Sequence, residues 1–127
     1  MTKKFLTVLL ITLTALYGCI SSNENESPVT YRIISYEEAQ QMLENNPSVI
    51  VLDVRTEPEH LARNMPGSLL LPVNELNEET AARHLPDKDS VILVHCRTGV
   101  RSSNAVEILR NMGYINVYDM DGIESWD

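Results

Sequence analysis

The sequence predicts an α/β fold with a mostly parallel central sheet flanked by helices. Two continuous runs of β-branched and aliphatic residues, at Val49–Val54 and Val91–His95, are bounded by turn residues. Such runs are typical of strands that are buried on both faces of a parallel sheet. Segments with the helical spacing of apolar residues alternate with these runs, which is the pattern of an α/β protein.

Local signals place the elements before the first run. A short strand is expected at Tyr31–Ile34. The S-x-x-E pattern of Ser35–Glu38 is a capping box, which predicts a helix over Glu37–Glu44. Asn45–Pro47 ends this helix and leads into the strand at Val49–Val54.

Shorter elements are expected between the two apolar runs. The proline at the start of Pro58–Ala62 can begin a short helix. Pro66 and Gly67 form a turn, after which Ser68–Leu71 is expected to be a short strand. Apolar spacing predicts a helix over Asn74–Leu85, and Pro86–Asp89 is expected to be the turn before the second run.

A helix and a strand are expected after the second run. The segment Ser102–Met112 places its apolar side chains on one face, which predicts a helix. Gly113 follows it, where the end of a helix favours a left-handed residue. Ile115–Tyr118 is expected to be the last strand.

Composition limits the classes of function. The chain has 127 residues, which is the size of one domain. Its 10 basic and 18 acidic residues give a net charge of −8. This balance argues against nucleic-acid binding, which needs a basic surface to replace counterions. Two cysteines, Cys19 and Cys96, are too few for a disulfide-rich scaffold, and no CxxC pair indicates a metal site.

Residues 1–18 have the pattern of a bacterial lipoprotein signal peptide. Lys3 and Lys4 precede an apolar run at Phe5–Tyr17, which is shorter than the roughly 20 residues that a membrane-spanning helix needs. The segment Leu16–Cys19 resembles the lipobox, in which a cysteine becomes lipidated and N-terminal after cleavage. We therefore expect Cys19 to anchor the chain by its lipid to a bacterial membrane, in the cell envelope, facing the periplasm or the exterior. The alternative is an ordinary signal peptide with an incidental cysteine.

The rest of the chain divides into a linker and a domain. Residues 19–30 are polar and lack an apolar period, which is typical of a flexible tether. The folded domain is expected over residues 31–127.

Cys96 follows the second buried run directly, at the edge of the sheet where α/β proteins bind ligands. The residues after it are Arg97, Thr98, Gly99, Val100 and Arg101, and a helix is expected from Ser102. The free N–H groups and the dipole of a helix N-terminus favour an anion, and the two arginines add positive charge. Gly99 allows the backbone to curl so that its N–H groups point inward. The pattern predicts a thiolate nucleophile that attacks an anionic substrate.

At this point the chain resembles the rhodanese family. The segment His95–Ser102 (HCRTGVRS) looks like the family's C-R-x-G-x-R loop, and Leu52–Arg55 looks like its L-D-V-R strand end. Pro66–Ser68 falls where the family has P-G-A, and Asp121–Trp126 is similar to its closing G-G-x-x-x-W. The resemblance implies a rhodanese-like three-layer fold across nearly the whole domain.

The resemblance also implies a sulfurtransferase. Cys96 would take a sulfane sulfur from thiosulfate or a related small anionic donor and hold it as a persulfide. Cyanide or a protein thiol would then accept the sulfur. Arg97 and Arg101 would orient the donor, and Asp53 would either organise the loop through Arg55 or contact the substrate. No metal or organic cofactor is implied.

The chain departs from the family pattern at three places. Arg63–Met65 stands where the family usually has G-H-I, which puts the packing of that corner in doubt. Asp121 stands in place of the first glycine of the closing pair. The chain stops one residue after Trp126, so the family's final helix is expected to be short or missing.

Four side chains near these motifs are expected to have structural positions. His60 and His84 are expected at the surface, and Trp126 is expected to pack as a lid. The side chain of His95 should point away from that of Cys96, because neighbours on a strand face opposite sides.

Two other functions remain open. Phosphatases and arsenate reductases of related folds use a similar cysteine loop, but theirs resembles C-x5-R, whereas Cys96 and Arg101 enclose the smaller C-x4-R. A rhodanese-like module that binds a partner or senses sulfide without catalysis is the second alternative. Inactive modules commonly lack the cysteine, which this chain retains.

Overall fold

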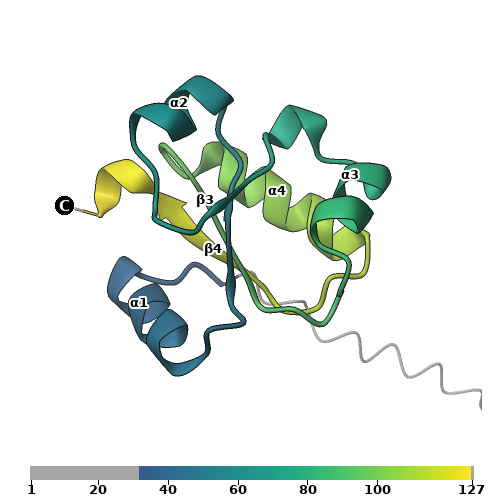
Figure 1. Ribbon diagram of the computed structural model, residues 1–127, viewed down its shortest axis with the longest axis horizontal. Helices are drawn as coiled ribbons and strands as arrows, with labels where there is room; N and C mark the ends of the chain where they lie inside the picture. Colours follow the sequence, from purple (N-terminus) through teal and green to yellow (C-terminus); the bar gives the residue numbers. More distant parts are fainter. Residues whose placement is uncertain (1–31, 127) are drawn as a thin grey trace, which may run out of the picture.

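The computed structural model describes residues 32–126, which form a four-stranded parallel sheet with helices around it (Figure 1). The predictions for residues 1–30, including the lipid on Cys19, lie outside the described residues. The strands, in the spatial order β2-β1-β3-β4, are β1 Ile50–Asp53, β2 Leu69–Leu70, β3 Ile92–Cys96 and β4 Val117–Gly122. Every pair of neighbouring strands is parallel, so the predicted α/β class is confirmed.

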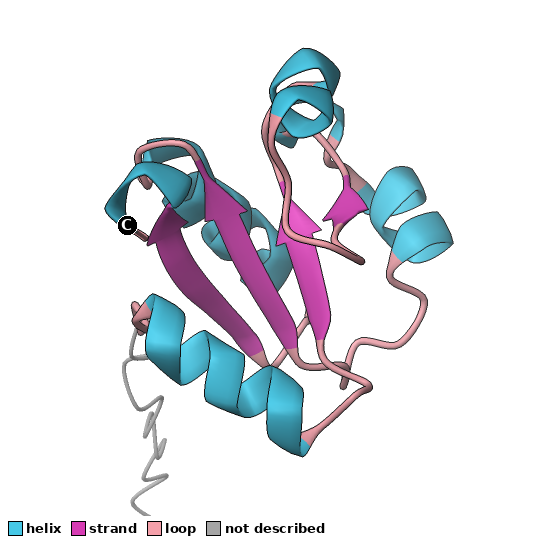
Figure 2. Ribbon diagram, turned by 60° about the vertical axis from the view of Figure 1, so that its left-hand side comes forward, coloured by secondary structure: helices cyan, strands magenta, loops and turns pink. Residues whose placement is uncertain are grey.

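The helices cover both faces of the sheet and produce three layers. They are α1 Tyr36–Asn45, α2 Glu57–Ala62, α3 Glu78–His84 and α4 Val100–Asn111, with the short 3₁₀ turns η1 Val73–Glu75 and η2 Ile123–Ser125. Helix α1 packs on one face of the sheet, and α3 and α4 pack on the other (Figure 2). Helix α2 lies at the end toward which the strand arrows point, where β1 leads into it (Figures 1 and 2). Between residues 32 and 126, no helix is long and apolar enough to cross a membrane.

The apolar runs behave as the sequence predicts, because both faces of the central strands are covered. Leu52 and Val94 belong to the core under α3 and α4, whereas Val51 and Leu93 belong to the core under α1. Alternate side chains of one strand therefore enter two separate apolar layers. Burial on both sides fixes the register of β1 and β3, and with it the position of Cys96 at the end of β3.

Three expected elements differ from the structure. The strand expected at the N-terminal edge of the domain is reduced to a single parallel bridge between Ile33 and Asp119. The helix expected over Asn74–Leu85 is divided, because the Asn77 side chain accepts the N–H groups of Glu79 and Thr80 and begins α3 there. The last strand is shifted toward the C-terminus, and Ile115, expected inside it, is 67% exposed.

The other expected elements are present with small changes of boundary. Ser35 caps α1 by accepting the Glu38 N–H at 3.1 Å, but Glu38 pairs with Arg32 instead of completing the capping box. The Pro66 and Gly67 turn is present, with Gly67 at a φ of 79°. Among the described residues, the short 3₁₀ turn η2 follows β4.

Candidate active site

Cys96 is the last residue of β3 and lies at the base of a tight loop that leads into α4. Its side chain is fully buried. Sγ accepts a hydrogen bond of 3.0 Å from the Gly99 N–H, and the thiol donates one of 3.5 Å to Ser102 Oγ. The Ser102 hydroxyl donates in turn to the Gly99 carbonyl oxygen at 3.0 Å. The sulfur therefore faces the inside of the loop and the first turn of α4.

The loop curls back on the sulfur because Gly99 has a φ of 96°, a conformation that favours glycine. Gly99 is also the N-cap of α4, so the first N–H groups of this helix have no intrahelical acceptor. These groups and the helix dipole favour negative charge at this end of α4. A thiolate or a persulfide anion on Cys96 would be stabilised there.

The end of β4 packs directly against the loop. A bulge between Asp119 and Gly122 gives β4 one extra residue and brings Gly122 beside Cys96. A Cβ on Gly122 would collide with the carbonyl oxygen of Arg97. The same carbonyl accepts the Glu124 N–H at 3.2 Å. Only glycine at position 122 leaves room for this close approach of two backbones.

Arg101 is paired with an acidic side chain that the sequence analysis did not assign to the site. Its Nη1 and Nη2 donate to the two Glu59 carboxylate oxygens, each at 2.8 Å. Glu59 also accepts the Thr56 N–H at 3.0 Å and the Thr56 hydroxyl at 2.8 Å, at the start of α2. The hydrogen bonds from Arg101 hold the pKa of the Glu59 carboxyl well below its usual range. This ion pair joins α2 to the first turn of α4 and neutralises Arg101.

The other loop residues form an exposed rim. Arg97, Thr98 and Val100 are exposed, and Val100 is 74% exposed although it is apolar. Arg97 Nε lies 3.6 Å from a Glu124 carboxylate oxygen, and both side chains are more than half exposed. Such a pair contributes little to stability, so these side chains are free to contact a ligand.

A buried ionic network lies at the end of β1, next to the loop in the sheet. Arg55 Nε donates to Asp53 Oδ1 at 3.0 Å, and Arg55 Nη2 donates to Asp53 Oδ2 at 2.8 Å. His60 Nδ1 lies 2.8 Å from Asp53 Oδ2. Burial raises the pKa of the Asp53 carboxyl, but the hydrogen bonds from Arg55 and His60 outweigh it, so the pKa lies below its usual value. These contacts organise the segment after β1 and do not reach the sulfur.

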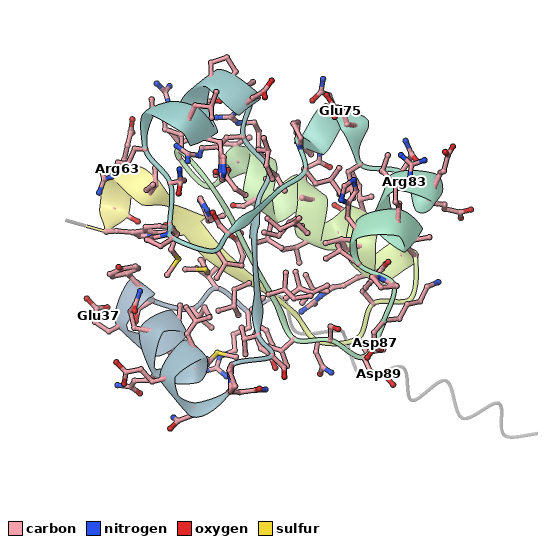
Figure 3. The ribbon with its side chains drawn as sticks, in the orientation of Figure 1. Glu37, Arg63, Glu75, Arg83, Asp87 and Asp89 are labelled. Atoms are coloured by element: carbon pink, nitrogen blue, oxygen red, sulfur yellow. The ribbon has the colours of Figure 1, made fainter. Side chains whose placement is uncertain are left out.

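The same network anchors the corner where the chain departs from the family pattern. Arg55 Nη2 donates to the Arg63 carbonyl oxygen at 2.5 Å, and Asn64 Nδ2 donates to the His60 carbonyl oxygen at 2.9 Å. Figure 3 shows the Arg63 side chain at the surface, and its backbone carbonyl takes part in the network. The expectation that His60 lies at the surface is wrong, because its side chain is 17% exposed and contacts Asp53. His84 is exposed, as expected.

His95 is buried on the opposite face of β3 from Cys96, as predicted. Its two ring nitrogens have no hydrogen-bond partner among residues 32–126, and Asp53 Oδ2 lies 3.9 Å from Nε2. Its ring centroid is 4.8 Å from that of Trp126, which stacks on Tyr36 at 5.0 Å. Burial lowers the pKa of His95 by more than the nearby Asp53 carboxylate raises it. Burial in this layer therefore favours the neutral form of the imidazole.

The structure places the residues predicted from the sequence at one end of the sheet. Cys96 ends β3, residues 97–99 form the loop, and Val100 and Arg101 begin α4. In the neighbouring strand β1, Asp53 is the last residue, and Arg55 lies just after it. Sequence reasoning missed Glu59, whose signal was the T-x-x-E pattern that begins at Thr56. No group of three or more His, Cys, Asp or Glu side chains in the described part of the chain is arranged to hold a metal ion.

Comparison with known proteins adds to this geometry. A family model described as a rhodanese-like domain matches residues 35–127. The thiosulfate sulfurtransferase PspE of Escherichia coli is 33% identical over 73 residues, which are 58% of this chain and 69% of that protein. A sulfurtransferase of Allochromatium vinosum is 31% identical over 94 residues, which are 73% of this chain and 85% of that protein.

A solved structure has the same fold. The crystal structure of a rhodanese-related protein from Thermoplasma volcanium superimposes with a TM-score of 0.64 and 33% sequence identity. The match covers 76% of this chain and 90% of that one.

Proposed function

Because the chain belongs to the rhodanese family, we propose that it is a sulfurtransferase that carries sulfur on Cys96 as a persulfide. The Cys96 thiolate attacks the outer sulfur of thiosulfate and forms a sulfur–sulfur bond. The sulfur–sulfur bond of thiosulfate breaks, and sulfite leaves with its electron pair. An acceptor, either cyanide or a thiol, then attacks the outer persulfide sulfur, and Cys96 leaves as a thiolate. The scheme needs no metal or organic cofactor.

The loop gives each proposed residue a part in this scheme. The Gly99 N–H and the first N–H groups of α4 stabilise the charge on Cys96 and on the persulfide. Arg97, Thr98 and Val100 at the exposed rim contact the donor. Arg101, whose charge is balanced by Glu59, keeps the first turn of α4 in place. Asp53 and Arg55 act as positioning residues.

One observation carries the proposal: Sγ of Cys96 accepts the N–H of the left-handed N-cap residue of α4. This hydrogen bond orients the sulfur toward a helix N-terminus, where a developing negative charge is stabilised. A cysteine that only fills the core does not require a hydrogen bond from a helix N-terminus. Because the thiol is fully buried, the donor must reach it through a small shift of the loop, whose rim residues are exposed.

We further propose that the domain works in the bacterial cell envelope. The lipobox-like Leu16–Cys19 segment supports removal of residues 1–18 and lipidation of Cys19. The polar residues 19–30 would then tether the domain, residues 31–127, to the membrane surface.

The proposed activity is tested by the steady-state transfer of sulfur from thiosulfate to cyanide. Cys96→Ser retains a hydroxyl that can accept the Gly99 N–H, so the fold should persist while the thiolate is lost. We expect the rate to fall by roughly 1,000-fold or more, because the covalent route is removed. Circular dichroism checks that the variant is folded.

Cys19→Ser is the matched control, since it removes the other cysteine of the chain. It should transfer sulfur at the wild-type rate when both proteins are purified without a membrane. A folded Cys96→Ser protein with wild-type turnover would contradict the proposal.

A further inference from the structure

The positive charge of the cysteine loop is partly balanced by neighbouring carboxylates. Both terminal nitrogens of Arg101 bond to Glu59, and Arg97 lies 3.6 Å from Glu124. The loop therefore presents less net positive charge to an incoming molecule than its two arginines imply.

Asp121 adds a third carboxylate, and this one has no hydrogen bond or ion pair with residues 32–126. It lies in the bulge of β4, next to the residue that pairs with Cys96 in the sheet. The bulge holds Asp121 at a φ of 65°, a left-handed conformation, and its N–H donates to Asp119 Oδ1 at 2.8 Å. Its carboxylate lies so close to Gly99 that a Cβ there would collide with Oδ1.

The backbone conformation of Asp121 makes the choice of residue informative. A left-handed backbone is easiest for glycine, and aspartate is one of the few other residues that adopt it. Residues held in sparsely populated conformations cluster at functional sites. The bulge therefore holds the Asp121 carboxylate in a fixed place beside Gly99.

Asp121 lies in the walls of two hollows, one against the cysteine loop and the other between the start of α1 and the end of β4. One, of about 250 Å³, is lined by Arg97, Thr98 and Glu124 among others. The other, of about 340 Å³, is lined by Tyr36, Glu37 and Trp126 among others, and its wall contains no lysine or arginine. The wall of the second hollow is therefore negative, whereas Arg97 lines the first.

We propose that Asp121 determines specificity for the sulfur acceptor and favours thiols that carry a positive charge near the sulfur. The inference rests on the proposed sulfurtransferase function. In the step concerned, the thiol attacks the outer persulfide sulfur of Cys96, a new sulfur–sulfur bond forms, and Cys96 is released as a thiolate. The thiol proton passes to solvent or stays on the product persulfide, so charge is conserved. The Asp121 carboxylate attracts the cation and repels an anionic acceptor.

The test uses three small thiols that differ in charge: cysteamine, 2-mercaptoethanol and mercaptoacetate. The kcat/KM for each acceptor is measured in the wild type and in Asp121→Asn, which keeps the shape and tolerates the left-handed backbone. For each thiol, kcat/KM of the variant is divided by kcat/KM of the wild type, so the intrinsic reactivity of the thiol cancels. We expect the ratio to fall about threefold for cysteamine, to rise about threefold for mercaptoacetate and to change little for 2-mercaptoethanol. In about 1 M salt these differences should shrink, because the Debye length is then only about 3 Å.

Asp89→Asn is the matched control, because it removes the same charge at the opposite end of the sheet, where Figure 3 labels Asp89 in the turn before β3. It should leave all three ratios at one. A peptide with the sequence Lys-Cys-Lys, compared with cysteamine, distinguishes a protein cysteine from a free aminothiol as the source of the cationic thiol. The thiol with the higher kcat/KM is the better source. Whichever thiol this is, the inference is supported if Asp121→Asn lowers its kcat/KM.

Equal changes for all three thiols, or no change for any, in a folded and active Asp121→Asn protein would overturn the role of Asp121 and leave the sulfurtransferase function intact. A wild-type protein that transfers sulfur to none of the three would instead overturn the proposed function, and this inference with it.

Discussion

Asp53 keeps a negative charge in the interior because Arg55 and His60 bond directly to its carboxylate. Two buried charges of opposite sign cost free energy to desolvate, and their pairing recovers it only while both partners are present. The sequence motif that contains Asp53 therefore acts through structure, by fixing the segment between β1 and β2.

Removing one partner of this pair should lower the free energy of unfolding far more than removing an exposed charge does. Asp53→Asn leaves the Arg55 guanidinium buried without its counter-charge, and we expect a loss of about 3–5 kcal/mol in the free energy of unfolding. Urea denaturation measures it. The exposed Asp89→Asn should lose less than about 0.5 kcal/mol. Similar losses in the two variants would show that the Asp53 pair contributes no special stability.

The buried His95 predicts how stability depends on pH. Burial places its pKa below the ordinary value of 6.5, so the unfolded chain takes up a proton at a higher pH than the folded chain. The associated stability is fully present above about pH 6.5 and is lost as the pH falls from there toward the folded pKa, by at most about 1.4 kcal/mol per pH unit. His95→Leu removes the titrating group, so its free energy of unfolding should fall less steeply over this range.

Urea denaturation at several values of pH provides the comparison. His84→Gln, which replaces an exposed histidine, is the matched control. If that control flattens the pH profile as much as His95→Leu does, burial of His95 is not the cause.

At the scale of elements, the site depends on the meeting of three chain segments at one end of the sheet. The loop after β3 provides the sulfur and the start of α4, the end of β4 supports the loop from below, and α2 reaches α4 through Glu59 and Arg101. Two of these segments follow parallel strands and the third is the end of one, so the common direction of the strands brings them together.

The left-handed glycine in the loop should be needed for activity as well as for stability. Gly99→Ala forces a Cβ into a φ of 96° and against Asp121, whereas Gly113→Ala meets the same backbone strain, at a φ of 93°, after α4. Both variants should lose about 1 kcal/mol or more of stability. Only Gly99→Ala should also lose sulfur transfer, by at least about tenfold, because the N–H bonded to the sulfur is displaced.

The assay is thiosulfate turnover by the folded variants at a temperature well below either melting point. Equal activity of the two variants would mean that the loop conformation does not control the reaction.

At the scale of the whole molecule, the strongest sequence signals were those that report burial. The continuous apolar runs located β1 and β3, and the family-like loop located the cysteine at the end of β3. The division of the expected helix at Asn77 was missed, because an N-cap residue inside a segment with helical spacing is a weak signal in the sequence. Whether its side chain caps a new helix or the first helix continues is decided by the packing of the folded chain. The contact of His60 with Asp53 and the bulge that holds Asp121 depend on strand register and on the path after β1, which sequence periodicity does not specify.

The proposed location of the protein is a property of the whole chain. Cys19→Ala removes the thiol that would carry the lipid, so we expect the chain to move from the membrane fraction to the soluble fraction of the cell envelope. Fractionation followed by immunoblotting measures the change, with Cys96→Ser as the control that should remain with the membrane. A Cys19→Ala protein that still sediments with membranes would contradict the lipid anchor.

The central claim is that Cys96 itself carries the transferred sulfur, and intact-protein mass spectrometry after treatment with thiosulfate tests it most directly. We predict that the wild-type chain gains the mass of one sulfur atom, that the added atom maps to the peptide containing Cys96, and that a thiol acceptor removes it. Cys96→Ser should show no gain. A wild-type protein that turns over thiosulfate without ever acquiring sulfur on Cys96, or a Cys96→Ser protein that acquires it, would contradict the account.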